Sequence, residues 1–582
     1  MSRAEERMTV SVLGDTPELR IYADLMSKAG AAVRRVRPDE KPAPAGVLAY
    51  SSDALPQDMV AWIDAQRSAV LCDIAGGRDL LGPSQQPLTE YQMQAAAALT
   101  ETTGFPGAAP TRSKVPFIAV STALYAASAT LSAMIAARPG DGRRKIVTSR
   151  FLSALNALTT YLPSALQGAT PTRIGNRHPS SAPWNSYPTS DGWILICTSK
   201  DDQWQRLRDL SGQPELNDPR FAVQTNRIAL RETIDAHLAR WTRTLTTGEC
   251  AKLMEGASIP AGPILGLDEL FEDANFRHRQ RPFVEAHRRQ SDATQSISLF
   301  RITEGYRTPS SFRPLRLNPE KPLAGLRVIE LGQFTTAPLA CRHLAALGAE
   351  VLKIEPPSGD AGRTWEPVVD GVSHYFTISN TGKRFERRDL RDPADMAWLK
   401  GEIRNSHVLI ENMRPGVLAK LGLSAAELRD VNPRLLTCSV SGFGADSAYP
   451  GRGAYDTVIQ GMSGLMAQTK SGVRPVKLGI SASDILGAQV SLFAIVSVLS
   501  ALETAGGKAI DISMQDISAY AALRGTNPEF EVAYEAAERW PSRTVRSITE
   551  HASFSESLSM FVPDDKGNMR HAIRLPYSIS LI

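Results

Sequence analysis

Two stretches of the chain resemble each other. "VSVLGDTPELRIYADLMSKAGAAVRRVRP" (10–38) is similar to "VIELGQFTTAPLACRHLAALGAEVLKIEP" (328–356), with Gly30 aligned on Gly348. Each pattern predicts a strand, a loop, a helix, a Gly-Ala turn and a second strand, which is how a doubly wound α/β sheet begins. The repeat constrains the fold more than composition does, because it predicts two sheets of one topology in a single chain.

A second pair of stretches lies further along each copy. "VPFIAVSTALYAASATLSAMIAA" (115–137) is similar to "VKLGISASDILGAQVSLFAIVSV" (476–498), and this alignment places Asp484 opposite Ala123. Both runs are apolar, but Ser, Thr and Tyr interrupt the first one, so it predicts a buried helix and not a membrane span.

Asp484 admits two interpretations. An aspartate before an apolar helix commonly caps it, accepting backbone N–H groups and interacting with the helix dipole. A carboxylate at a helix N-terminus can also be a nucleophile or an acid/base group. The first copy keeps the helix and has alanine at the aligned position. That difference favours a working residue present in one copy only, although both interpretations remain open on this pattern.

The region between the copies has another character. "SDGWILICTS" predicts a turn and a strand, "DDQWQRLRDL" an amphipathic helix, and "IPAGPI" a chain reversal. We therefore predict an α/β protein with two Rossmann-like large domains and a small α+β domain between them. The expected segments are a degraded large domain at 1–170, the small domain at 171–306, a Pro-rich linker at 307–322, a catalytic large domain at 323–525 and a C-terminal segment of unknown structure at 526–582.

Composition excludes several classes of protein. The formal net charge of +4 is too small to imply nucleic-acid binding. Five cysteines without CxxC spacing argue against a zinc site and a disulfide framework, and they suit a reducing cytoplasm. The first residues lack the apolar core of a signal peptide. We expect a cytoplasmic protein with no nucleic-acid, membrane or metal partner.

The second copy carries a series of motifs in a fixed order. They are "SNTGKR", "VLIENMRPGVLAKLGL", "NPRLLTCSVSGFG", "AYDTVIQGMSGLM", "GISASD" and "ISMQD". This succession resembles the class III CoA-transferases, the group of formyl-CoA and carnitine CoA-transferases and α-methylacyl-CoA racemases. The middle region, with "SDGWILI", "DPRF" and "IPAGPI", is similar to the small domain of the same family, and the first 137 residues resemble a degraded large domain.

The resemblance implies a reaction and a set of site residues. Asp484 stands where the family has its catalytic carboxylate, which transfers coenzyme A from an acyl-CoA donor to a carboxylate acceptor through a covalent aspartyl intermediate. Coenzyme A is then a cosubstrate, and no permanent cofactor or metal is expected. The residues at family positions near coenzyme A are Lys353, Lys383, Arg384, Asn412, Met413, Arg414 and Lys420. Taken singly, a lysine or arginine is more often a solvated surface charge.

The chain also departs from the family pattern. Tyr455 stands where the racemases have histidine, so a transferase is favoured over a racemase. Tyr455 and Asp456 are expected either at the site or, equally, as a core ring and a helix cap. Thr335 and Thr336 replace a pair that is commonly Gln-Ala or Leu-Ala, so the acyl end of the site is expected to differ.

Three alternatives to a transferase remain. They are a racemase, a CoA-linked lyase on the same scaffold, and an inactive homologue. The last is considered because no second small domain follows "ISMQD". Members of the family form interlocked ring dimers, so the tandem chain is expected to be an intrachain pseudo-dimer in which the small domain covers Asp484, with a homodimer as the other possibility.

Overall fold

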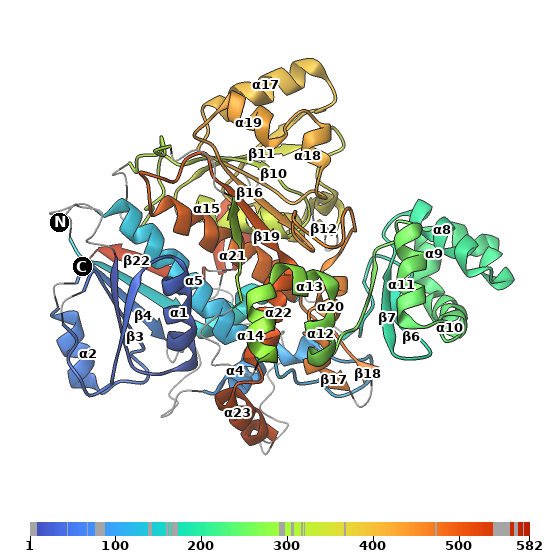
Figure 1. The fold of residues 1–582 in the computed structure, drawn as a ribbon, viewed down its shortest axis with the longest axis horizontal. Helices are drawn as coiled ribbons and strands as arrows, with labels where there is room; N and C mark the ends of the chain where they lie inside the picture. The colour runs from blue at the N-terminus through green and yellow to red at the C-terminus, as the bar shows by residue number, and fades with distance from the viewer. Residues whose placement is uncertain are drawn as a thin grey trace.

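A computed structural model gives the fold of the chain. It describes residues 8–43, 45–66, 68–75, 88–137, 142–158, 161, 165, 173–289, 297–303, 308–315, 318, 320–365, 368–369, 371–471, 474–538, 559–563, 569–573 and 575–581. Two large sheets, each with helices against it, form most of the molecule, and a small domain lies to one side (Figure 1). The predicted α/β class is confirmed.

The first sheet has five parallel strands and one antiparallel edge strand. In spatial order these are β2 (Ala32–Val36), β1 (Thr9–Leu13), β3 (Val47–Tyr50), β4 (Val70–Ala75), β5 (Arg144–Ser149) and the antiparallel β22 (Tyr577–Leu581). The three inner strands β1, β3 and β4 are mostly apolar and buried, as expected of parallel strands covered on both faces.

The second sheet repeats this order with one further strand at its edge. It runs β14 (Arg384–Arg387), β11 (Glu350–Glu355), β10 (Arg327–Leu331), β15 (Val408–Glu411), β16 (Leu436–Ser441), β19 (Ala509–Ser513) and the antiparallel β9 (Arg301–Thr303). From β11 to β9 it matches the first sheet from β2 to β22, strand for strand, so the repeat seen in the sequence is a repeat of topology.

Each sheet takes its antiparallel edge strand from outside its own repeat. β9 follows the small domain in the chain and pairs with β19 of the second sheet, whereas β22 follows the second repeat and pairs with β5 of the first sheet. Tyr577 of β22 lies in the seam between the halves, where its hydroxyl is 3.3 Å from His343 Nδ1 and His343 Nε2 is 3.2 Å from the Tyr125 hydroxyl. The two halves are therefore connected through exchanged strands as well as through packing.

Two long apolar helices form the centre of the molecule. α5 (Phe117–Ala136) and α21 (Ala482–Leu499) pack on each other, and Gln489 Nε2 donates to Ser121 Oγ across the contact at 2.7 Å. By length and composition each could cross a membrane, but 94% of each apolar window is buried inside the protein. They are core helices here, which confirms the buried helix predicted at 115–137.

The remaining elements of the large domains pack on both faces of the two sheets. In the first half they are α1 (Pro17–Lys28), α2 (Gln57–Asp64), α4 (Glu90–Ala96), the 3-10 turn η1 (Thr100–Thr102) and α6 (Arg150–Ala157). In the second half they are α15 (Thr336–Ala346), η4 (Ala361–Thr364), β12 (Val368–Val369), β13 (Val372–Ser373), α16 (His374–Asn380), α17 (Pro393–Arg404), α18 (Val417–Lys420), α19 (Ala425–Val431), α20 (Asp456–Met462), η5 (Met466–Gln468), β17 (Lys470–Ser471), β18 (Arg474–Pro475) and α22 (Met514–Arg524), followed by α23 (Pro528–Glu538) and the hairpin of β20 (Ser559–Pro563) and β21 (Met569–Ile573).

The small domain has its own core. Its antiparallel sheet consists of β6 (Trp184–Pro188), β7 (Trp193–Cys197) and β8 (Ala261–Pro263), and its helical part of α8 (Asp201–Ser211), η2 (Pro214–Asn217), η3 (Pro219–Ala222), α9 (Gln224–Ala229), α10 (Arg231–Thr242) and α11 (Thr247–Gly256). The strand predicted from "WILIC" is β7 and the helix predicted from "DDQWQRLRDL" is α8. In Figure 1 the domain lies at the right, next to α20 of the second half.

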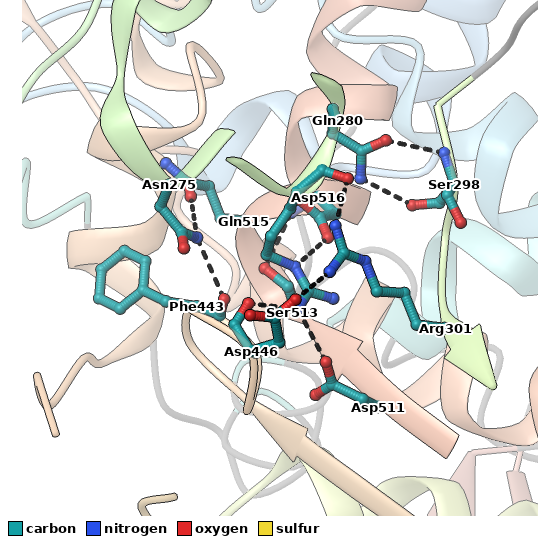
Figure 2. Close-up of polar contacts among 12 residues, drawn as sticks. Asn275, Gln280, Ser298, Arg301, Phe443, Asp446, Asp511, Ser513, Gln515 and Asp516 are labelled. Atoms are coloured by element: carbon teal, nitrogen blue, oxygen red, sulfur yellow. Dashed lines mark hydrogen bonds and ion pairs between the residues drawn. The ribbon is translucent and has the colours of Figure 1, made fainter. Parts of the chain in front are cut away.

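Three short helices then tie the small domain to the second half. They are α12 (Leu267–Glu272), α13 (Ala274–Arg279) and α14 (Arg281–Arg288). The fully buried Arg279 guanidinium donates to Asp511 and to Asp516, each at 2.7 Å. Figure 2 shows the surrounding contacts, in which Asn275 Nδ2 donates to the Phe443 carbonyl and to Gln515 Oε1. These contacts fix the approach of the small domain to the second sheet.

The Pro-rich stretch is not a free spacer where the structure describes it. Phe312 is fully buried, its ring meets His407 edge-on, and Ser310 N donates to the Leu502 carbonyl at 2.7 Å. Residues 308–315 of the predicted linker therefore pack against the second half.

Candidate functional site

A cavity of about 600 Å³ lies between the small domain and the second sheet. One wall comes from the carboxyl ends of the second sheet's strands, with Leu331 ending β10, Asn412 following β15 and Ser441 ending β16. The small domain supplies the opposite wall, including His178 and Trp184. Open α/β sheets bind ligands at this edge of the strands, and the volume suits a small-molecule site.

Asp484 lines this cavity from the first turn of α21. The helix N-cap is Ser481, so Asp484 is the third residue of the helix, and its Oδ1 accepts a hydrogen bond from the Thr336 hydroxyl at 2.9 Å. The backbone N–H groups of Ser483 and Asp484 donate to Asp456 Oδ1 at 2.8 and 3.3 Å. The capping interpretation of Asp484 is therefore wrong, since Asp456 on another helix performs that task.

Two causes raise the pKa of Asp484 to about 7. Burial against the core disfavours the charged carboxylate, and the negative charge of Asp456 adds to the effect, while hydrogen bonds from Thr336 and Thr335 oppose it. Asp456 also has a raised pKa because it is buried, but the positive charge of Lys477 and the bonds from Gln460 and from the two backbone amides favour its ionised form. Lys477 and these donors thus stabilise the charge of Asp456, and Asp484 has no such cation among the groups that act on it.

Tyr455 and Asp456 both lie at the cavity, and Asp456 caps α21 instead of the helix that it begins. The Tyr455 hydroxyl hydrogen-bonds with Ser199 of the small domain, and its ring packs against Trp184 with 4.8 Å between centroids. Both residues line the cavity. Thr335, whose hydroxyl bonds that of Tyr375, and Thr336 lie beside Asp484, so the departure at 335–336 does fall at the site.

Sequence reasoning missed Lys477. Its side chain is 7% exposed and lines the cavity, and the segment that carries it is held by the first half of the chain. Asn176 accepts from Lys477 N at 2.8 Å and donates to the Pro475 carbonyl at 2.9 Å, and Thr103 accepts from Gly479 N at 3.0 Å. A lysine inside the apolar run "VKLGI" was the available signal, because lysine is rarely buried without a reason.

Lys353 and Lys383 do not reach the cavity, contrary to the expectation that they face coenzyme A. Both side chains have no exposed surface, and their ammonium groups lie 2.8 and 2.7 Å from the two oxygens of buried Glu330. Lys353 also pairs with Asp360 at 2.9 Å. The two lysines neutralise carboxylates inside the domain, so they are neither phosphate ligands in this arrangement nor solvated surface charges.

The other predicted coenzyme contacts divide into two groups. Asn412, Met413 and Arg414 line the cavity, and Asn412 is fixed by two hydrogen bonds with the Gln333 backbone, at 2.8 and 2.9 Å. Arg384 on β14 and Lys420 at the end of α18 are exposed and do not line the cavity. Contact with coenzyme A stays a prediction for all five.

The first half has the same cap and no carboxylate at the helix position that Asp484 occupies in the second half. Glu90, the first residue of α4, accepts from the backbone N–H groups of Ile118 and Ala119 at 2.9 and 3.0 Å, as Asp456, the first residue of α20, does for α21. Counted from the helix starts, Asp484 therefore corresponds to Ala119. The alignment with Ala123 was wrong by about one helical turn, since an apolar run carries little information on register.

Comparisons with known proteins agree with the motifs. The family model described as CoA-transferase family III matches residues 73–313 and 323–547. The succinate–glutarate CoA-transferase of Agrobacterium fabrum is 36% identical over 226 residues, covering 37% of this chain and 56% of that protein. The acetyl-CoA:oxalate CoA-transferase of Acetobacter aceti is 41% identical over 202 residues, covering 34% and 52%. The chain thus spans about half the length of the curated relatives it matches.

Solved structures were compared as well. A CAIB/BAIF family protein from Brucella suis is 34% identical, with a TM-score of 0.34, over 38% of this chain and 59% of that one.

Proposed function

The chain belongs to CoA-transferase family III, and from that premise we propose that its second half transfers coenzyme A from an acyl-CoA thioester to a carboxylic acid, with Asp484 as the covalent carboxylate. The observation that carries the proposal is the placement of Asp484. It lines a cavity between two domains at the carboxyl edge of a parallel sheet, with its backbone amide and one carboxylate oxygen held by other residues.

The proposed chemistry divides one exchange into anhydride and thioester steps. The Asp484 carboxylate attacks the acyl-CoA carbonyl and displaces the thiolate, which gives a mixed anhydride. The thiolate attacks the aspartyl carbonyl, releasing the first acid and leaving an aspartyl thioester. The acceptor carboxylate attacks that thioester and forms a second anhydride, and the thiolate then attacks the acceptor's acyl carbon. The products are the new acyl-CoA and free Asp484.

The surroundings of Asp484 suit a nucleophile. Desolvation destabilises the carboxylate relative to its neutral acyl derivatives, and this is the same effect that raises its pKa to about 7. Thr336 orients one oxygen, and Asp456 fixes the backbone of the turn. A nucleophile held in one position loses less entropy at each of the acyl-transfer steps.

Relatives suggest the size of the substrates. The curated relatives are named for succinate and glutarate, and for acetyl-CoA with oxalate. By extension we expect small carboxylic acids as acceptors here, and acetyl-CoA or succinyl-CoA as donors.

Trapping the enzyme thioester tests the proposal. The full chain is incubated with acetyl-CoA or succinyl-CoA, digested under mildly acidic conditions and examined by mass spectrometry. Coenzyme A mass on the peptide that contains Asp484, absent from Asp484→Asn, is the expected result. Absence of the adduct, together with no exchange between donors and acids, would favour the inactive-homologue alternative.

A further inference from the structure

Lys477 is a buried cation in the wall of the proposed active-site cavity. Three other cationic side chains line the same cavity, and they differ from it: Lys200 and Arg414 are exposed, and Arg452 donates to the Ala261 carbonyl at 2.7 Å while lying over the Tyr449 ring. Lys477 is 7% exposed. Of these four, it is the charge that has been most fully removed from solvent.

No carboxylate of the described residues lies within ion-pair distance of the Lys477 ammonium. Asp456 is the nearest source of negative charge, but its Oδ1 accepts from Ser483 N and Asp484 N, and its Oδ2 accepts from Gln460 Nε2 at 2.8 Å. A buried charge without a paired counter-ion is costly. Burial accordingly lowers the pKa of Lys477, which the charge of Asp456 offsets in part.

Lys477 and Asp484 line the same cavity and interact with different neighbours. The Asp484 carboxylate interacts with Thr335, Thr336 and Asp456. The charge of Lys477 acts instead on Cys197 and His178 of the small domain, as well as on Asp456. Asp456 interacts electrostatically with both Asp484 and Lys477.

Aromatic rings line the same cavity. Tyr455 packs on Trp184, which also packs on His178 with 4.8 Å between centroids. Burial lowers the pKa of His178 to about 4, so this imidazole is neutral at pH 7 and adds no second cation. The cavity wall therefore offers these aromatic rings together with the charges of Lys477 and Asp456.

We propose that Lys477 binds the second, non-reacting carboxylate of the acid substrate, so that the protein selects dicarboxylates over monocarboxylates. An acid whose reacting carboxyl lies at Asp484 extends its other end along the aromatic wall toward Lys477. A carboxylate there completes a buried ion pair, whereas a methyl group leaves the ammonium unpaired and excludes water from it. This inference rests on the proposed CoA transfer for the identity of the reacting end.

Matched acids test the inference. Glutarate and pentanoate have the same chain length and differ in one terminal carboxylate, and succinate and butyrate form a second pair. Transfer from acetyl-CoA is measured with the full chain and with Lys477→Met, which removes the charge and keeps the length. The substitution should lower kcat/KM for glutarate by about 30-fold or more, the effect of removing one partner of a buried ion pair, and should change pentanoate only a few-fold.

Two further variants control for structural damage. Lys477→Arg should restore most of the preference for glutarate, because it returns a cation to the site. Lys200→Met removes another lysine of the same cavity and should change both acids by the same factor. Equal losses for glutarate and pentanoate in Lys477→Met, or no preference in the wild-type chain, would overturn the inference.

Calorimetric binding separates this inference from the proposed function. Glutarate is titrated into the wild-type chain and into Lys477→Met without any coenzyme. Binding that is lost in the variant while the unfolding temperature is kept supports Lys477 even if no transfer is detected. Failure of glutarate to bind the wild-type chain, while transfer to pentanoate proceeds, overturns the role of Lys477 and leaves the proposed function intact.

Discussion

The two halves share a scaffold and differ in chemistry. Both have the same order of strands, a central apolar helix and an acidic residue on the preceding helix that caps it, Glu90 for α5 and Asp456 for α21. In the first half the third helix position is Ala119, fully buried, and in the second it is Asp484 in a cavity wall. The capping acid is thus common to both halves, whereas the carboxylate at the third helix position is present in the second half alone.

A second difference concerns the helix that faces this position. α1 begins at Pro17, and the Thr16 side chain caps it by accepting from Leu19 N at 3.3 Å. α15 begins at Thr336, its N-cap Thr335 makes no capping bond, and the Thr336 hydroxyl donates to Asp484. α1 thus has an ordinary capped start, whereas α15 lacks a side-chain cap and directs its first hydroxyl to Asp484 at the candidate site.

The largest effect is expected from removing the nucleophile. Asp484→Ala should lower transfer by at least about a thousandfold, because a covalent catalyst is lost, while the circular dichroism spectrum is unchanged, since Ala119 is accommodated at the same helix position. Steady-state transfer assays check the rate. Near-normal turnover in the folded variant would end the assignment of Asp484.

The second largest effect is expected from breaking the ion pairs that hold α13 against the second half. Arg279→Met leaves Asp511 and Asp516 without their buried cation and should cost about 3–5 kcal/mol of unfolding free energy, with a raised KM because α13 anchors the small domain. The matched change in the first half is Arg150→Met, which removes an ion pair with Glu18 at 2.9 Å. That variant should lose stability with KM unchanged. Urea denaturation and kinetics distinguish the two, and equal effects on KM would contradict the distinction drawn between the halves.

The two capping acids can be exchanged for alanine in turn. Glu90→Ala and Asp456→Ala should each cost about 1–3 kcal/mol of unfolding free energy, because two buried N–H groups lose their acceptor. Only Asp456→Ala should also lower the pKa of Asp484, by removing a neighbouring negative charge. Comparison of the pH–rate profiles of the two variants tests this, and a shifted profile for Glu90→Ala would show that the halves are not separable in this way.

The smallest effect is a dependence on pH. Asp484 must be ionised to attack, and its pKa is raised to about 7, so the rate should fall about tenfold per pH unit below 7 and gain only about twofold between pH 7 and its plateau. The effect of pH on the stability of the fold has the opposite sign to its effect on the rate. A carboxyl whose pKa is higher in the folded chain holds its proton there between about pH 4 and 7, so its contribution to stability is lost as pH rises through that window.

The variant Asp484→Asn isolates the contribution of this carboxyl to the pH dependence of stability. The variant should have the same unfolding temperature as the wild-type chain near pH 4 and a higher one near pH 8. No equivalent change is expected for substitutions at Ala119, which has no charge to titrate. A wild-type rate independent of pH from 5 to 8 would contradict the raised pKa.

The sequence was sufficient for features encoded in contiguous residues. The repeated βαβ start and the apolar helix at 115–137 follow from local patterns, and the structure contains both. The place of Asp484 at the start of an apolar run was also visible in a local pattern. The edge strands β9 and β22 were not predicted, because each is short and contributes to a sheet far away in the chain.

The burial of charged side chains was the other feature that could not be predicted from the sequence. Lys353 and Lys383 share Glu330, and Lys353 also pairs with Asp360 on a different segment, so no local pattern marks them as interior. Lys477, His178 and Trp184 come together only when the small domain closes on the second sheet. Pairings of this kind are set by tertiary structure, and a motif shows only one side of them.

The exchanged edge strands bear on how the chain is made. β22 pairs with β5, and Ser580 bonds to Lys145, 435 positions earlier in the chain. A ribosome makes the five parallel strands of the first sheet, the small domain and the whole second sheet before it makes the strand that finishes the first one. Domains usually fold in the order of their synthesis, but here β5 of the first sheet has no partner on its outer side until β22 has been made. The first sheet therefore reaches its complete form only after the second half has been made.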